Sequence, residues 1–247
     1  MWSSSLRISC VCFLSISSLC FGEALSPILN DVQATARSIY GLKPAPSLVV
    51  YVTGGGVQLV PSLLATPGAS NSVLDVQIPY SRSSLVELLG KEPASYCSAD
   101  VAHDLAAAAY ERALLLAKRE HASDSEGDDG GGTSSRQRAI VGLGCTAALR
   151  SVPMNRGEHR CYVAVRTAQG TQELALTLTK GARSRELEDA VVSRVALAAL
   201  AHACGVGSAP RPEDAASFWC LDADECDAEI GESVSDERLE VSFRSPD

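Results

Sequence analysis

The sequence lacks the features of a polytopic membrane protein, a nucleic-acid-binding protein and a zinc protein. No uninterrupted apolar run reaches about 18 residues, the length typical of a membrane-spanning helix. Lysine and arginine number 21 against 30 aspartates and glutamates, and aromatic residues make up 5%, so we expect no basic surface for nucleic acid. The nine cysteines include no C-x-x-C pair and no zinc-type cysteine–histidine spacing. We therefore expect no metal site and no membrane association, and a globular fold with reduced, buried thiols.

The excess of negative charge belongs to the C-terminal region. Residues 211–247 contain twelve acidic residues and three arginines, and this local net charge equals the net charge of −9 of the whole chain. We interpret residues 206–247 as an acidic tail or linker and expect it to be mostly disordered beyond Pro210.

The N-terminal residues 1–24 form a candidate targeting segment. Arg7 precedes an interrupted apolar stretch that ends at Phe21, and the small residues Gly22 and Ala24 follow at a spacing that a signal peptidase accepts. Secretory or plastid targeting is one reading, and no targeting function is the other. We favour a cytoplasmic protein and leave this segment out of the fold.

Strands alternate with helices between residues 25 and 205, which predicts one three-layer α/β/α sandwich domain. The expected helices cover residues 25–40, 81–90, 98–118 and 184–203, and the expected strands cover residues 47–52, 72–78, 138–144, 158–167 and 172–179. The low-complexity stretch 119–136 is predicted to be a disordered loop.

Two glycine-containing segments follow predicted strands and are candidates for phosphate binding. Thr53-Gly54-Gly55-Gly56 leads into a helix, whose first amide groups favour an anion, although the segment fits neither a Walker A loop nor a G-x-G-x-x-G motif. A tight structural turn is the alternative. Gly142-Leu143-Gly144 is expected to form a second turn at the same sheet edge, where open α/β folds bind ligands. Arginine suits phosphate binding, and the arginines that could face such a crevice are at positions 82, 150, 156, 160, 183 and 185. A solvated surface charge is the alternative for each.

No pair of a nucleophile and a base stands out among these residues. Of the four histidines, only His159 in the sequence Gly157-Glu-His-Arg160 begins a predicted strand, and we favour a structural or surface role for it.

The order of several motifs resembles the C-terminal domain of the CinA family over residues 30–205. The resemblance rests on Thr53-Gly54-Gly55, Thr66-Pro67-Gly68-Ala69-Ser70, Tyr80-Ser81 followed by Leu88-Leu89-Gly90, Ser98-x-x-Val101-Ala102 and Gly181-Ala182-Arg183. It implies a CinA-type α/β domain. The family includes nicotinamide mononucleotide deamidases, metal-free amidohydrolases that use a serine nucleophile, a lysine base and a tyrosine.

The resemblance also implies that the reaction machinery is lost. The serine position holds Tyr51, the lysine position holds Leu85, and only the tyrosine persists, as Tyr80. A phenol without a neighbouring amine is a poor nucleophile at neutral pH, so Tyr51, Tyr80 and Ser81 are weak catalytic candidates. The expected ligand-binding residues are Thr53, Gly54, Gly55, Gly56, Tyr80, Arg82, Gly142, Gly144 and Arg183.

One branch of the family looks closer still. Ile78-Pro79-Tyr80-Ser81-Arg82, Arg156-Gly-Glu-His-Arg160 and Thr177-Leu-Thr-Lys180 resemble plant-type proteins in which a CinA-like domain precedes a domain related to nicotinamide mononucleotide adenylyltransferase. The His-x-Gly-His motif of such a transferase is not present in these 247 residues. We expect the acidic tail to be the linker toward that domain.

Three functions follow as expectations. The leading one is a catalytically degenerate CinA-like domain of NAD metabolism that binds a pyridine mononucleotide or another phosphorylated small molecule and needs no cofactor. The alternatives are an active nicotinamide-nucleotide amidohydrolase and a non-catalytic interaction module. We also expect that the chain can form a homo-oligomer.

Overall fold

The apolar run after Pro46 forms β1 (Ser47–Thr53), and all seven of its residues are buried. The computed structural model describes residues 32–125, 138–153, 156–209 and 238–245. In it, β1 lies inside a six-stranded sheet with the order β2-β1-β3-β4-β5-β6. Its two neighbours, β2 (Val73–Gln77) and β3 (Ile140–Ala148), both run parallel to it. Parallel neighbours need crossover connections, and helices supply them here.

The second half of the sheet is antiparallel. β4 (His159–Thr167) and β5 (Gly170–Leu178) form the predicted hairpin, and β6 (Arg238–Arg244) adds to its outer side. This last strand corrects the expectation of a mostly disordered tail, because its alternating sequence Arg-Leu-Glu-Val-Ser-Phe-Arg fits a strand. The candidate targeting segment and tail residues 210–237 lie outside the described residues.

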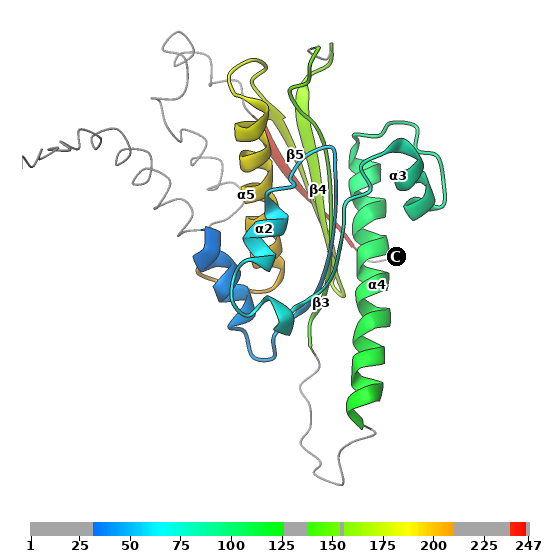
Figure 1. Ribbon diagram of the computed structural model, residues 1–247, viewed down its shortest axis with the longest axis vertical. Helices are drawn as coiled ribbons and strands as arrows, with labels where there is room; N and C mark the ends of the chain where they lie inside the picture. The colour runs from blue at the N-terminus through cyan, green and yellow to red at the C-terminus, as the bar shows by residue number, and fades with distance from the viewer. Residues whose placement is uncertain (1–31, 126–137, 154–155, 210–237, 246–247) are drawn as a thin grey trace, which may run out of the picture.

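Helices cover both faces of the sheet, which confirms the three-layer α/β/α sandwich (Figure 1). One face carries a helix over residues 32–40, α2 (Leu59–Leu64) and α5 (Arg185–Ala203). The other face carries α3 (Arg82–Leu89) and α4 (Ala99–Ser125). A short 3-10 helix, η1 (Ala69–Asn71), precedes β2.

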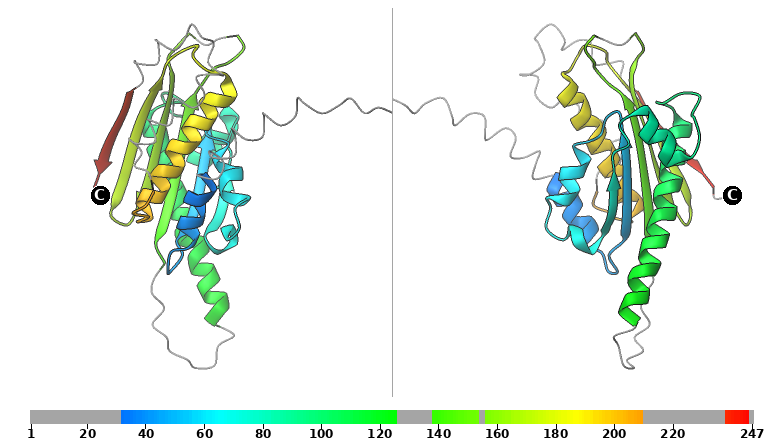
Figure 2. Two further views of the ribbon diagram at one scale, coloured as in Figure 1. Left: turned by 90° about the vertical axis from the view of Figure 1, so that its left-hand side faces the viewer. Right: turned by 45° about the vertical axis from the view of Figure 1, so that its right-hand side comes forward.

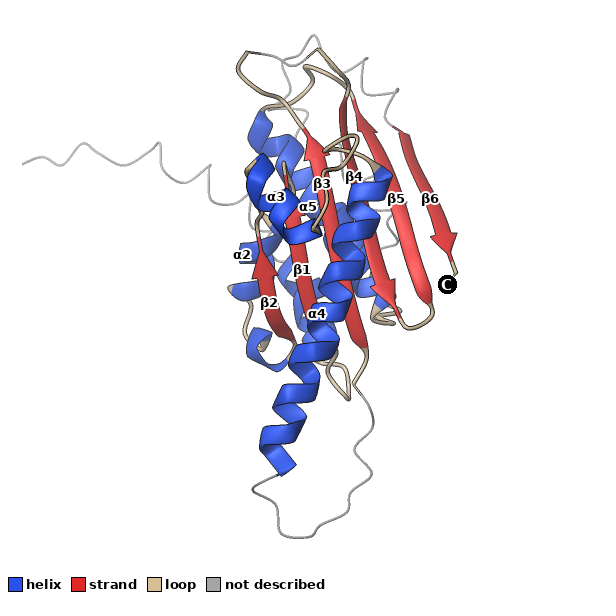
Figure 3. Ribbon diagram, turned by 90° about the vertical axis from the view of Figure 1, so that its right-hand side faces the viewer, coloured by secondary structure: helices blue, strands red, loops and turns tan. Residues whose placement is uncertain are grey.

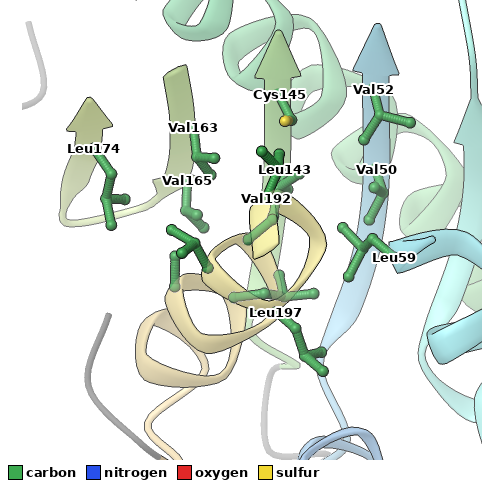
Figure 4. Close-up of a cluster of buried hydrophobic side chains, with 14 of the residues drawn as sticks. Val50, Val52, Leu59, Leu143, Cys145, Val163, Val165, Leu174, Val192 and Leu197 are labelled. Carbon is green, nitrogen blue, oxygen red and sulfur yellow. The ribbon is translucent and has the colours of Figure 1, made fainter. Parts of the chain in front are cut away.

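The side chains of β1 alternate between two separate cores. Val50 and Val52 belong to the larger core beneath α5 and α2, whereas Val49 and Tyr51 belong to the core beneath α3 and α4. Figure 4 shows side chains of the larger core that point from the strands toward α5, among them Leu143, Cys145, Val163, Val165 and Leu174. Val192 and Leu197 of α5 belong to the same core.

Polar caps set the ends of the helices that the sequence predicted best. The hydroxyl oxygen of Ser81 accepts a hydrogen bond from the Ser84 amide, and that of Ser184 accepts one from the Leu187 amide. Gly90 ends α3 in the left-handed conformation, with φ of 69°. The boundaries of α3 and α5 therefore agree closely with the prediction.

Two predicted boundaries were wrong. α4 continues to Ser125 rather than ending at Lys118, because Arg119 and Glu120 are good helix formers, so the first part of the predicted 119–136 loop is helical. β3 extends to Ala148, so Gly142 and Gly144 are strand residues and form no turn. Residues 126–137 lie outside the described part of the chain.

The four cysteines in the described ranges are free thiols. Cys145 and Cys161 are buried, and Cys97 and Cys204 are half-buried. Burial raises the pKa of the Cys204 thiol to about 12 and shifts the pKa of the other three upward. Among the described residues, no group of three or more histidine, cysteine or acidic side chains is arranged to hold a metal, and no helix has the length and apolarity for crossing a membrane.

Candidate functional site

The glycine segment forms a tight turn at the C-terminal end of β1. Gly54 and Gly56 have φ values of 72° and 82°, which side-chain-bearing residues rarely adopt. A Cβ on Gly54 would lie 2.0 Å from the carbonyl oxygen of Ala147 at the end of β3. The hydroxyl of Thr53 donates to the carbonyl oxygen of Pro79 at 2.8 Å, which joins the ends of β1 and β2. The segment is therefore held closely by both neighbouring strands.

The amide groups that follow this turn are bound by a carboxylate of the protein itself. The amides of Gly56 and Val57 donate to Oδ1 of Asp189 at 2.8 and 3.2 Å, and the amide of Gln58 donates to Oδ2 at 2.9 Å. The side chain of Asp189 comes from α5, and the residue is 8% exposed. The predicted phosphate position at the start of α2 thus already holds a buried anion, which would repel a second one.

Arginines surround the other side of the same turn. Arg185 donates to the carbonyl oxygens of Gly54 and, at 3.3 Å, of Arg150. Arg150 in turn donates from Nη1 to the carbonyl oxygen of Arg183 at 3.0 Å. Arg183, a predicted ligand residue that is 5% exposed, thus contributes its backbone carbonyl to the network beside the glycine turn. Figure 2 shows the start of α5, where this network lies, near the end of the sheet at which β1 and β3 finish.

A buried pair of side chains lies behind these arginines. Nδ1 of His159 and Oε1 of Glu188 are 2.5 Å apart, and both side chains are 0% exposed. The other carboxylate oxygen of Glu188 accepts from the Arg150 amide at 2.7 Å. This pair joins the start of β4 to α5 and to the loop after β3. Of the two expectations for His159, the surface position is wrong, and the buried contact with Glu188 agrees with a structural role.

Tyr51 lies on the opposite face of the sheet, in the core under α3 and α4. It is 2% exposed and packs in one cluster with Leu85, which is also 2% exposed, and with Val49, Val101 and Leu105. Its hydroxyl oxygen accepts a hydrogen bond from the Gln77 amide group at 3.4 Å. Burial raises the pKa of the phenol, and the negative charge of Asp75 raises it further.

The remaining predicted residues of β2 and α3 are spread over the surface. Tyr80 is 69% exposed, and Ser81 is used as the N-cap of α3. Arg82 forms an ion pair with Glu92 at 2.6 Å and lies over the ring of Tyr96, 5.0 Å from its centroid. Glu92 and Tyr96, the partners of Arg82, both lie on the loop between α3 and α4.

Gly142 and Gly144 lie within β3 and face the backbone of α4. A Cβ on Gly142 would stand 2.2 Å from the Tyr110 amide nitrogen, and one on Gly144 would stand 2.3 Å from the Ala102 carbonyl oxygen. The helix passes so close that these positions leave no room for a ligand. The prediction of a second glycine turn that binds a ligand was wrong, and close helix–strand packing is the reason for these glycines. Figure 3 shows α4 crossing the sheet over β1 and β3.

Comparison with known proteins decides the fold family. No protein-family model matches the sequence, and no curated protein matches it. A CinA superfamily protein from Escherichia coli has a similar structure, with a TM-score of 0.50 and 15% identity over 76% of this chain and 92% of that chain. The fold is CinA-like.

Two further solved structures are similar at lower scores. The competence/damage-inducible protein CihA from Agrobacterium tumefaciens has a TM-score of 0.48 and 15% identity, covering 70% of this chain and 95% of that chain. A CinA superfamily protein from Enterobacter cloacae has a TM-score of 0.44 and 10% identity, covering 80% of this chain and 99% of that chain.

Within the CinA-like fold, the two positions that the sequence resemblance assigns to nucleophile and base lie together. Tyr51 on β1 and Leu85 on α3 pack in one apolar cluster. The structure thus unites these two positions but separates them from the glycine turn, because Tyr51 points to the α4 face while Gly56 faces Cys145 and Val192 in the core beneath α5.

The sequence analysis missed Asp189, the residue that binds the amide groups of the turn. Asp189 is separated from Gly56 by more than a hundred residues, and no local motif announces it. The available signal was an acidic residue directly before the apolar run Ala190-Val191-Val192 of a helix that was expected to cover the sheet.

Proposed function

We propose that this CinA-like domain has no amidohydrolase activity. The observation that carries the proposal is the shared cluster of Tyr51 and Leu85, each 2% exposed. A nucleophile must reach its substrate and be activated by a neighbouring base. Here the phenol is enclosed by α3 and α4, its pKa is raised rather than lowered, and an isobutyl group occupies the position that the resemblance assigns to the base.

The other hydroxyl candidate supports the same conclusion. The oxygen of Ser81 accepts the hydrogen bond of the Ser84 amide as the cap of α3. Breaking this bond to free the hydroxyl for attack would weaken the start of α3, at a cost of about 1 kcal/mol.

The test is ammonia release from nicotinamide mononucleotide by the full chain. We expect the same rate as with heat-denatured protein. Release of ammonia that disappears in Tyr51→Phe or Ser81→Ala would overturn the proposal, because both variants remove only a hydroxyl. Their matched comparison is Tyr40→Phe, which removes a hydroxyl that donates to the Leu63 carbonyl oxygen on the other side of the sheet.

We also propose that a phosphorylated ligand, a pyridine mononucleotide in NAD metabolism, binds through the arginine network and not through the amides of α2. The support is the pair of guanidinium groups of Arg150 and Arg185 beside the Gly54 turn, together with the carboxylate of Asp189 on those amides. Arginine binds phosphate with two parallel hydrogen bonds. A setting beside an adenylyltransferase-related domain remains an expectation from the sequence resemblance.

Calorimetric titration with nicotinamide mononucleotide tests the ligand. Arg185→Ala is expected to weaken binding at least about tenfold, since charge-assisted hydrogen bonds contribute about 1.5–3 kcal/mol. Arg82→Ala is the matched control and should leave binding unchanged, because Arg82 is paired with Glu92. No heat at millimolar ligand, or an equal loss in both variants, would contradict this site.

A further inference from the structure

The outer edge of the sheet at β6 is an open strand. Six of its seven residues are exposed and Leu239 is half-buried. Among the described residues, β6 pairs only with β5, and no helix lies over it (Figure 3). Within the described part of the chain, no strand pairs with the backbone groups on the far side of β6.

The two faces of β6 differ in chemistry. Leu239, Val241 and Phe243 lie opposite Leu176, Leu174 and Gln172 of β5, on the face of the sheet that α5 covers. Val241 is 38% exposed and Phe243 is 62% exposed, so both present apolar surface beside the edge. Glu240, Ser242 and Arg244 alternate with them on the other face.

β6 has only part of the usual protection of an edge strand, namely the charged side chains of Arg238, Glu240 and Arg244. Residues 238–244 contain no proline and no lysine. The opposite edge of the sheet, β2, is shorter, has half-buried residues and is followed by Pro79. The two edges of the described sheet thus differ, and β6 is the longer and more exposed of the two edge strands.

We propose that β6 pairs with β6 of a second copy of this chain, antiparallel and with a two-fold axis at Ser242. A two-fold axis perpendicular to the sheet keeps each face on its own side, so each residue meets one of the same face. In this register Glu240 lies opposite the partner's Arg244, and Val241 lies opposite the partner's Phe243. Each of these two pairs occurs twice.

The distribution of charge along β6 selects this register. A two-fold axis at Val241 would place Arg238 opposite the partner's Arg244, and an axis at Glu240 would place the two Glu240 side chains opposite each other. Like charges directly opposite each other destabilise a strand pair, and opposite charges stabilise it. Of these three registers, the one with its axis at Ser242 places opposite charges across from each other. The same register also forms the two apolar pairs of Val241 with Phe243.

The product is a continuous sheet of twelve strands across two copies, six from each. The strand pair supplies main-chain hydrogen bonds on the edge, and the side-chain pairs supply the specificity. The dimer uses no residue of the arginine network, so it stands independently of the proposed ligand site.

The experiment is to measure the molar mass of the full chain by analytical ultracentrifugation over a concentration series into the hundreds of micromolar. The wild-type chain should reach twice the mass of one chain. Ser242→Lys should raise the dimer dissociation constant by more than about tenfold, because it places two ammonium groups opposite each other at the axis. Ser242→Thr should keep the dimer, because threonine is favourable in strands and in cross-strand pairs.

Ser83→Lys is the control for the effect of the added positive charge, because it adds the same charge at an exposed position of α3. This variant should dimerise as the wild type does. Ser242 is itself exposed, so a monomer with lysine there should keep its circular dichroism spectrum and its unfolding midpoint.

Hydrogen exchange gives a second readout. Amides of residues 240–244 should exchange more slowly as the dimer forms, and Ser242→Lys should abolish that protection. A wild-type chain that stays monomeric throughout, a dimer unaffected by Ser242→Lys, or an equal loss in Ser83→Lys would overturn the proposal.

Discussion

Two groups of glycines serve different physical purposes in this molecule. Gly54 and Gly56 lie in a turn with positive φ, where the backbone conformation requires glycine. Gly142 and Gly144 lie in an ordinary strand, where glycine is required because the backbone of α4 passes within contact distance. The same residue type thus marks a bend in one place and a close contact in the other.

The comparison teaches that a glycine after an apolar run does not by itself indicate a ligand. The turn group has its amide groups bound to Asp189, and the strand group is covered by a helix. In both cases the space that a phosphate would use is filled by the protein. Substitutions can separate the two explanations, because they predict different losses of stability.

Gly142→Ala should have the largest effect. The new methyl group would stand 2.2 Å from the Tyr110 nitrogen and 2.5 Å from the Ala106 carbonyl oxygen, and helix backbone cannot move aside as a side chain does. We expect a loss of about 3 kcal/mol or more in the free energy of unfolding, measured in urea, from overpacking. A loss below about 1 kcal/mol would show that α4 does not hold this distance.

Asp189→Ala should have the next largest effect. It removes the acceptor of three amide groups, including the buried amide of Gly56, and an unsatisfied buried donor costs about 1–3 kcal/mol. We expect a loss of about 2–3 kcal/mol in urea unfolding and faster hydrogen exchange at residues 56–58. Asp189→Asn keeps one acceptor oxygen and should lose less, and an equal loss in both variants would contradict the role of the carboxylate.

Gly56→Ala and Gly90→Ala form a matched pair with the smallest effects. Both glycines have positive φ, 82° and 69°, which costs about 1–2 kcal/mol for an alanine. A Cβ on Gly90 meets nothing within 4 Å, whereas one on Gly56 meets Cys145 and Val192 side chains at 3.1 Å. Gly56→Ala should therefore lower the unfolding midpoint more, and the reverse order would contradict the tight packing of the turn.

Local signals predicted most of the fold. The buried run of β1, the serine caps of α3 and α5, and the left-handed Gly90 are all set by neighbours in the sequence. β6 was not predicted. Four of its seven residues are charged or polar and it lies in an acidic segment, so its strand conformation depends on pairing with β5, which is distant in the sequence.

The candidate site was less predictable than the fold. The turn at Gly54 and Gly56 was located correctly after the strand that precedes it. The partner of the turn was missed, since Asp189 reaches it through tertiary packing alone. Arg82 was assigned to the ligand because arginine suits phosphate. Its pairing with Glu92 and Tyr96 could not be foreseen, because it depends on the path of the loop after α3.

The position of β6 in the chain has a consequence for synthesis. Residues 179–237 separate it from β5, its neighbour in the sheet. β5 leaves the ribosome long before β6 has been translated. During that interval β5 is the edge strand of the nascent sheet, and its outer backbone groups are unpaired. Unpaired strand edges promote aggregation with other chains. We therefore expect this protein to be most prone to misassembly before its translation is complete.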